Sequence, residues 1–166
     1  MSANRYEPHV LVLPEDDANR DIVIGFRRNS WVNFRQLQVE DVAGGWLEVV
    51  QRFEGEHVRE MRRLANRHVV LLIDLDGHAD RIGVVKARVP PDLADRVYVL
   101  GALTEPEEFR RSLGPFEEIG MSLANDCQEG TDRTWGHELL RHNAAEVDRM
   151  RERVRGILFQ SGRDHR

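Results

Sequence analysis

The sequence contains one cysteine, Cys127, and one lysine, Lys86. A single cysteine excludes a disulfide bond within the chain and any zinc site built from several thiolates. Cys127 lies in a stripe of apolar residues, so we expect a small buried side chain rather than a reactive thiol. Lys86 follows a valine, so the chain also lacks the Gly-Lys-Ser or Gly-Lys-Thr signature of a phosphate-binding loop.

Long apolar runs are missing as well. The longest one, at residues 69–73, is far too short to span a bilayer, which requires about 20 apolar residues. The first residues of the chain lack the apolar stretch of a secretory signal peptide. We therefore expect a cytoplasmic protein with no membrane partner. The net charge of −5 argues against a protein that coats nucleic acid non-specifically.

Short apolar runs alternate with helical patterns along the chain, which is typical of an α/β fold. The runs predict about four mainly parallel strands, flanked by helices on both faces, at residues 9–13, 35–39, 69–73 and 96–100. Helices are expected after a cap at Asp16 or Asp17, and over residues 46–66, 80–87, 104–113, 115–127 and 139–158. We expect one domain over residues 1–166, with an α/β core at 8–113 and a C-terminal helical extension at 114–160.

Two helices carry specific signals. Thr104 and Glu107 have the spacing of a capping box, which predicts the start of the helix that ends near residue 113. In the terminal helix, arginines alternate with Asp148 and Glu152, which predicts an exposed face with local ion pairs. The apolar stripe of that helix is expected to pack on its own domain, and pairing with a second copy in a homodimer is the alternative.

Acidic residues follow two of the predicted strands. Glu15 comes directly after the first strand, and Asp74 and Asp76 come directly after the five-residue apolar run of the third. In an open parallel sheet, ligands bind beyond the carboxyl ends of the strands. Asp74 and Asp76 are two residues apart and would point to the same side of an extended segment. Three crowded carboxylates repel one another, and a hard divalent cation such as Mg²⁺ relieves that repulsion. The alternative is a purely structural role, in which these acids only cap the next helix.

This layout resembles the Toprim domain, which is shared by topoisomerases, bacterial primases and nucleases of the overcoming-lysogenization-defect type. That family has a glutamate after its first strand and an Asp-x-Asp after its third, matched here by Glu15 and by Asp74 and Asp76. The resemblance covers about residues 8–113. One difference is Asp16, where the family usually has glycine.

The resemblance implies phosphodiester hydrolysis that depends on Mg²⁺ or Mn²⁺. The three acids would be catalytic and would hold the metal, and the partner would be DNA or RNA. It also implies a small stand-alone nuclease or nuclease-like subunit, and any ATPase that works with it would be a separate protein. A catalytically degenerate Toprim domain that acts as a binding or assembly module is the non-enzymatic alternative.

The segment 73–77 also resembles the first motif of haloacid-dehalogenase-type phosphatases. In that interpretation Asp74 would be the nucleophile and Asp76 the general acid. The motif is normally near the start of its domain and continues with threonine, whereas here it is mid-chain and continues with His78.

Two residues near the acidic motif are candidates for contact with phosphate. Arg81 follows the motif by about one helical turn, and an arginine suits bidentate recognition of phosphate. The alternative for Arg81 is an ion pair with Asp80 or Glu105. His78 is adjacent to the motif, and the alternative for it is a solvated loop residue.

Overall fold

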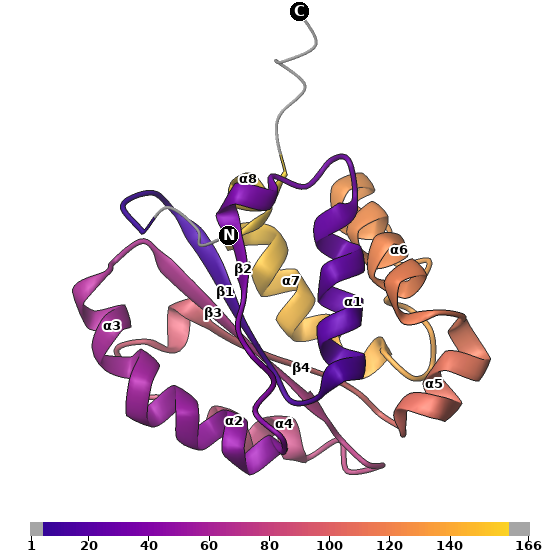
Figure 1. Ribbon diagram of the computed structural model, residues 1–166, viewed down its shortest axis with the longest axis horizontal. Helices are drawn as coiled ribbons and strands as arrows, with labels where there is room; N and C mark the ends of the chain where they lie inside the picture. Colours follow the sequence, from indigo (N-terminus) through magenta and orange to yellow (C-terminus); the bar gives the residue numbers. More distant parts are fainter. Residues whose placement is uncertain (1–4, 160–166) are drawn as a thin grey trace, which may run out of the picture.

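The computed structural model describes residues 5–159, and residues 1–4 and 160–166, which include the last residue expected in the C-terminal extension, lie outside this range. The expected α/β fold is confirmed (Figure 1). Its sheet has four strands, all parallel, in the order β2-β1-β3-β4. The strands are β1 (His9–Pro14), β2 (Leu37–Val39), β3 (Arg67–Asp74) and β4 (Val97–Ala102). β1 pairs with β3 along its whole length, from His9 opposite Arg67 to Pro14 opposite Leu72.

Both faces of the sheet are covered by helices (Figure 1). One face packs against α2 (Trp46–Arg52), α3 (Val58–Arg63) and α4 (Arg81–Lys86). The other packs against α1 (Asp17–Arg28), α6 (Phe116–Glu129), α7 (Ala144–Arg153) and α8 (Arg155–Leu158), with α5 (Pro106–Leu113) beside α6. This burial on both sides explains why β1, β3 and β4 contain continuous apolar runs rather than alternating ones. In the described part of the chain, no helix has the length and apolar character needed to cross a bilayer.

The helix expected over residues 46–66 is interrupted and ends early. A π-helical turn at Phe53–His57 separates α2 from α3, and α3 ends at Arg63. The predicted capping box is wrong, because the N-cap of α5 is Glu105 and not Thr104. Pro106 takes the first helical position and confines the preceding residue to an extended conformation, so the cap moves by one residue.

The terminal helix is not continuous either. A 3₁₀ turn at Arg141–Asn143 precedes α7, and α8 begins at Arg155. Asn143 explains this break, because its buried side chain accepts a hydrogen bond from the Gly101 amide and donates one to the Gly101 carbonyl. The side chain therefore satisfies the open edge of β4 as a fifth strand would.

The terminal region forms a local ion pair between Arg149 and Glu146 of α7, rather than pairs with Asp148 and Glu152, and its arginines also contact the segment before β4. Arg149 binds Glu146 and the carbonyl of Ala94, and Arg153 binds Asp95. These contacts tie α7 to the segment that leads into β4.

Glu146 is the main polar anchor of α7 on the sheet. Its side chain is buried, with an exposed fraction of 4%, and it accepts hydrogen bonds from the Val99 amide, Lys86 Nζ and Arg149 Nη1 at 2.7–2.9 Å. Burial acts to raise the pKa of this carboxyl, but the hydrogen bonds outweigh it and lower the pKa. The carboxylate is thus fully satisfied, which is the condition for a buried charge to be tolerated.

We expect Glu146→Gln to lower the free energy of unfolding by about 2 kcal/mol, because the amide removes one acceptor from a buried network with two cations. Chemical denaturation at pH 7 measures this loss. Because the folded-state pKa is lowered, the contribution of Glu146 is present above its unfolded-state pKa and is lost as the pH falls through the folded-state value. Glu152→Gln, on an exposed position of the same helix, is the control and should change stability by less than about 0.5 kcal/mol. Equal effects of the two substitutions would contradict the anchoring role.

Candidate functional site

The order of the strands identifies one edge of the sheet as the place for a ligand. From β1 the chain crosses to β2 on one side and later to β3 on the other, so the winding reverses between β1 and β3. In doubly wound sheets the crevice beyond the carboxyl ends of the strands at such a reversal is where ligands bind. Glu15 follows β1, and Asp74 is the last residue of β3, so the two acids flank this crevice.

The structure brings Glu15 and Asp74 together, as the sequence predicts. Glu15 Oε2 accepts a hydrogen bond from the backbone amide of Asp74, and the Glu15 amide donates to the carbonyl of Leu72 at 2.9 Å. Asp74 Oδ1 accepts a hydrogen bond from Asn19 Nδ2 on α1 at 3.3 Å. The site is therefore built by the ends of two strands and the first turn of one helix.

Asp16 is a third carboxylate of this group, which the sequence analysis treated only as a helix cap. It is indeed the N-cap of α1, since its Oδ1 accepts a hydrogen bond from the Asn19 amide at 2.9 Å. Its carboxyl also lies within interaction range of Asp74, where it is one of the groups that raise the pKa of that residue. One signal could have found Asn19: it is a polar residue on the helical stripe that continues with Ile22, Val23 and Phe26.

The surroundings of Asp74 and Glu15 change the pKa values of both carboxyls. Burial, followed by the neighbouring carboxyls of Asp16 and Glu15, raises the pKa of Asp74 to about 8. Burial also raises the pKa of Glu15, and Asp16 and Asp76 act in the same direction. Asp74 is therefore largely protonated at neutral pH, and a nearby cation would favour its charged form.

Asp76 does not lie on the same extended segment as Asp74. β3 ends at Asp74, and Asp76 has a left-handed backbone conformation with φ of 49°. The alternation rule applies only to extended backbone, so the expected shared orientation of the two aspartates does not follow. Asp76 Oδ2 instead accepts a hydrogen bond from Arg81 Nη1 at 3.1 Å, and its side chain is 55% exposed.

Arg81 closes the other side of the acidic edge. Its Nη1 also donates to the carbonyl of Asp74 at 2.8 Å, and its guanidinium carbon lies 4.8 Å from the centre of the Trp46 ring. The alternative of an ion pair with Asp80 or Glu105 is wrong, because the acidic partner is Asp76. His78 is exposed in the turn between β3 and α4. Trp46, the first residue of α2, is also a member of this edge and packs in part against the core.

The donor set suits a hard cation in its chemistry, since it consists of carboxylate oxygens. Glu15, Asp16 and Asp74 would hold the metal, and Asp76 would join them on release from Arg81. As they are placed, however, no three histidine, cysteine, aspartate or glutamate side chains among residues 5–159 are positioned to hold one metal ion together.

Comparison with known proteins gives no relative. The chain matches no protein-family model, no curated protein and no solved structure. The function therefore has to be inferred from the site itself.

Proposed function

We propose that this protein is a Toprim-like, metal-dependent nuclease or nuclease-like subunit that acts on nucleic-acid phosphodiesters. The observation that carries the proposal is the group of Glu15, Asp16 and Asp74 at the switch point of an all-parallel sheet, where burial, followed by the neighbouring carboxyls, raises the pKa of Asp74 to about 8. A divalent cation at this point would relieve the repulsion among the carboxylates.

The residues divide into two roles in this proposal. Glu15, Asp16 and Asp74 would hold Mg²⁺ or Mn²⁺, and Asp76 would join them once its ion pair with Arg81 opens. When bound, such a metal stabilises negative charge on the phosphate and on the leaving oxygen. Arg81 is the candidate for contact with a flanking phosphate, because its guanidinium is already fixed at the same edge by Trp46 and Asp76.

A catalytically degenerate Toprim module is the second candidate. The observation that favours it is the ion pair between Arg81 and Asp76, which neutralises one acid of the expected set. A haloacid-dehalogenase-like phosphatase is less compatible with the site. Such an enzyme needs Asp76 as a general acid, and here the Asp76 carboxylate is paired with Arg81.

Cleavage of single- and double-stranded DNA and RNA in the presence of Mg²⁺ or Mn²⁺ tests the proposal, with the native protein compared with Asp74→Ala. We expect cleavage by the native protein and at least about a hundredfold loss in the variant, as for the removal of a group that acts directly in catalysis. Metal-dependent nucleic-acid binding without cleavage would support the degenerate module. A phospho-aspartate trapped at Asp74 would instead identify the phosphatase.

Arg81→Gln tests the role of the arginine separately. We expect weaker binding of single-stranded DNA and a decrease of about 0.7 in the salt slope of the binding constant, which corresponds to one lost phosphate contact. Fluorescence anisotropy at several salt concentrations measures that slope. Arg88→Gln is the matched control, because Arg88 pairs with Glu54 away from the acidic edge. The same change of slope in both variants would show a general effect of charge.

A further inference from the structure

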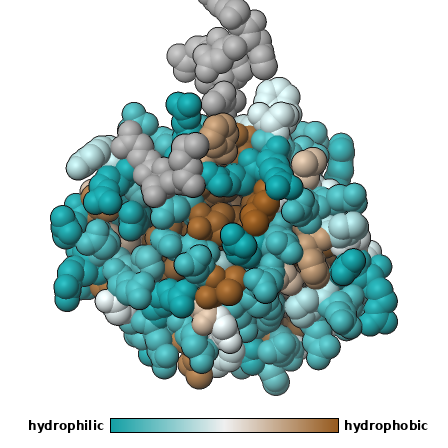
Figure 2. Space-filling model, viewed as in Figure 1, coloured by the Kyte–Doolittle hydropathy of each residue, from teal (hydrophilic) through white to brown (hydrophobic). Residues whose placement is uncertain are grey.

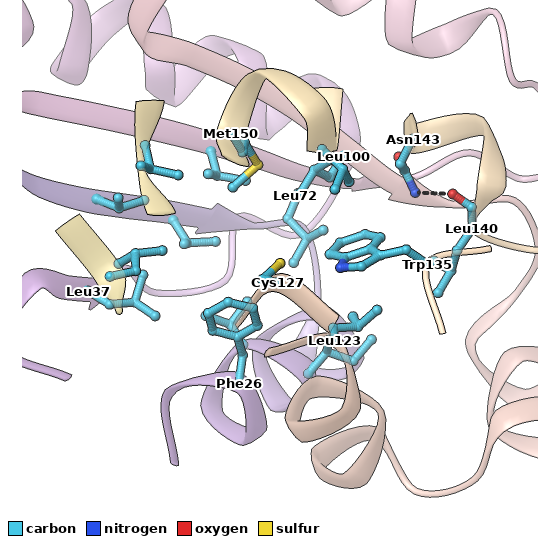
Figure 3. Close-up of a pocket in the computed structure, with 18 of the residues that line it drawn as sticks. Phe26, Leu37, Leu72, Leu100, Leu123, Cys127, Trp135, Leu140, Asn143 and Met150 are labelled. Carbon is cyan, nitrogen blue, oxygen red and sulfur yellow. Dashed lines mark hydrogen bonds between the residues drawn. The ribbon is translucent and has the colours of Figure 1, made fainter. Parts of the chain in front are cut away.

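A cavity lies between the sheet and the helices of its second face, and its wall reaches Asn19, the residue that binds Asp74 at the acidic edge. Its volume is about 100 Å³, and it is enclosed mainly by apolar side chains of β1, β3, α1, α6 and α7. Figure 3 shows Leu72, Leu100, Phe26, Leu123 and Met150 around this space. In Figure 2, apolar side chains reach the surface between β2 and α1 on this side of the molecule.

Two buried hydrogen-bond donors on the wall of the cavity have no partner. Trp135 Nε1 and Arg151 Nε are both inaccessible to solvent, and neither meets an oxygen or nitrogen acceptor among the described residues. The ring nitrogen of Trp135 is turned toward the interior, near Cys127 (Figure 3). Burial raises the pKa of the Cys127 thiol, while hydrogen bonding from the Trp135 side chain and the charge of Arg151 act to lower it, so the sulfur of Cys127 is a weak acceptor beside the indole.

The two donors are held in place by the rest of the structure. The backbone amide of Trp135 donates to Asp126 Oδ2 at 3.0 Å. Arg151 Nη1 binds Asp132 Oδ1 at 3.0 Å, and its Nη2 donates to the carbonyl of Thr131. These contacts leave the indole N–H and the Nε–H fixed and available, and fixed donors favour binding because little freedom is lost.

The two N–H donors and the apolar side chains of the cavity indicate what kind of ligand would fit. Buried donors without partners are rare, and each loses stability that an acceptor would restore. A water molecule both donates and accepts, whereas a carboxylate only accepts and matches two N–H groups, one of them on a guanidinium. An apolar cavity of about 150 Å³ holds benzene, so about 100 Å³ holds a body of roughly four carbon atoms.

We propose that this cavity binds a short, branched monocarboxylic acid, whose hydrocarbon body fills the apolar space and whose carboxylate accepts hydrogen bonds from Trp135 Nε1 and Arg151 Nε. The site would let the protein respond to a small acid bound on the other side of Asn19 from the acidic edge.

Titration with 3-methylbutanoate, followed by NMR of the tryptophan indole groups, tests the proposal. We expect the indole N–H signal of Trp135 to move and saturate, while those of Trp31 and Trp46 stay in place. The alcohol 3-methylbutan-1-ol has the same hydrocarbon body without the charge and should bind at least about tenfold more weakly. A Trp135 signal that stays in place, or equal binding of the alcohol and the acid, would overturn the proposal.

A pair of variants provides a second measurement. The acid should raise the thermal midpoint of the native protein and of Trp31→Phe, since a ligand stabilises the state that binds it. The rise should fall or vanish in Trp135→Phe, which keeps an aromatic ring and removes the donor. The same rise in all three proteins would exclude Trp135 as the anchor. Xenon should enter the cavity whether or not it meets a donor, and failure of xenon to shift the signals of the lining methyl groups would show that the cavity does not admit ligands.

Discussion

Gly120→Ala is expected to lower the free energy of unfolding by about 3 kcal/mol, at the upper end of what overpacking usually costs. Gly120 lies on α6 where this helix crosses α1. A Cβ atom at this position would overlap the backbone carbonyl of Ile22 and would come within 2.6 Å of the amide nitrogen of Phe26. Backbone atoms cannot change rotamer, so the helices would have to move apart. Thermal or chemical denaturation measures the loss.

A second glycine, Gly25 on α1, lies similarly close to the backbone of α6. A Cβ atom at Gly25 on α1 would overlap the backbone of Glu117 on α6, so the two helices approach each other through a glycine on each side. Gly83→Ala is the matched control, because this helical glycine has no atom within 4 Å of an added Cβ. There we expect a gain of about 0.5–1 kcal/mol from the higher helix propensity of alanine. A comparable loss in Gly83→Ala and Gly120→Ala would contradict the close-approach explanation.

The fold was predictable where local pattern and burial agree. The apolar run at residues 69–73 gives β3, because only a strand covered on both faces needs such a run. The breaks were not predictable, because tertiary contacts cause them. Asn143 ends the regular pattern by binding the edge of β4, and no residue near it in the sequence indicates that partner. The cap of α5 could have been predicted from Pro106.

The same division holds for the candidate site. Glu15 and Asp74 were predicted to meet because both follow strands, and strand ends of a parallel sheet meet at one edge. Asp76 was misplaced because its left-handed backbone depends on the turn after β3 rather than on the strand pattern. Asp16 was not predicted as a member of the group, because a role as the N-cap of the next helix is enough to explain an aspartate at this position of the sequence.

Asp74→Asn is expected to stabilise the protein by about 2–3 kcal/mol at pH 8 and to leave it nearly unchanged at pH 4. Burial, followed by Asp16 and Glu15, raises the folded-state pKa of Asp74 from 3.8 to about 8, so between these values the folded chain keeps a proton that the unfolded chain releases. The free energy of unfolding therefore falls as the pH rises through this range, by up to about 1.4 kcal/mol per pH unit for this group. Asparagine resembles the protonated acid and removes that dependence. Denaturation of both proteins at several pH values measures the difference.

Asp17→Asn is the control for this substitution, because Asp17 is an exposed acid of the same segment and should change stability by less than about 1 kcal/mol at any pH. Identical pH dependence in the native protein and Asp74→Asn would show that another group causes the slope.

Added Mg²⁺ tests whether the acidic edge binds a metal, which the pH dependence of stability alone does not show. A metal that binds the deprotonated acids of the folded state stabilises that state in proportion to its occupancy, and it competes with the proton on Asp74. We therefore expect Mg²⁺ to raise the thermal midpoint of the native protein at pH 8, to do so much less at pH 5, and to leave Asp74→Asn unaffected. If the pH slope is found but Mg²⁺ has no effect at pH 8, the raised pKa of Asp74 stands and the proposed metal site does not. Three neighbouring carboxyls without a cation lower the stability of the folded chain at neutral pH. The ligand that relieves this repulsion would then be one other than Mg²⁺.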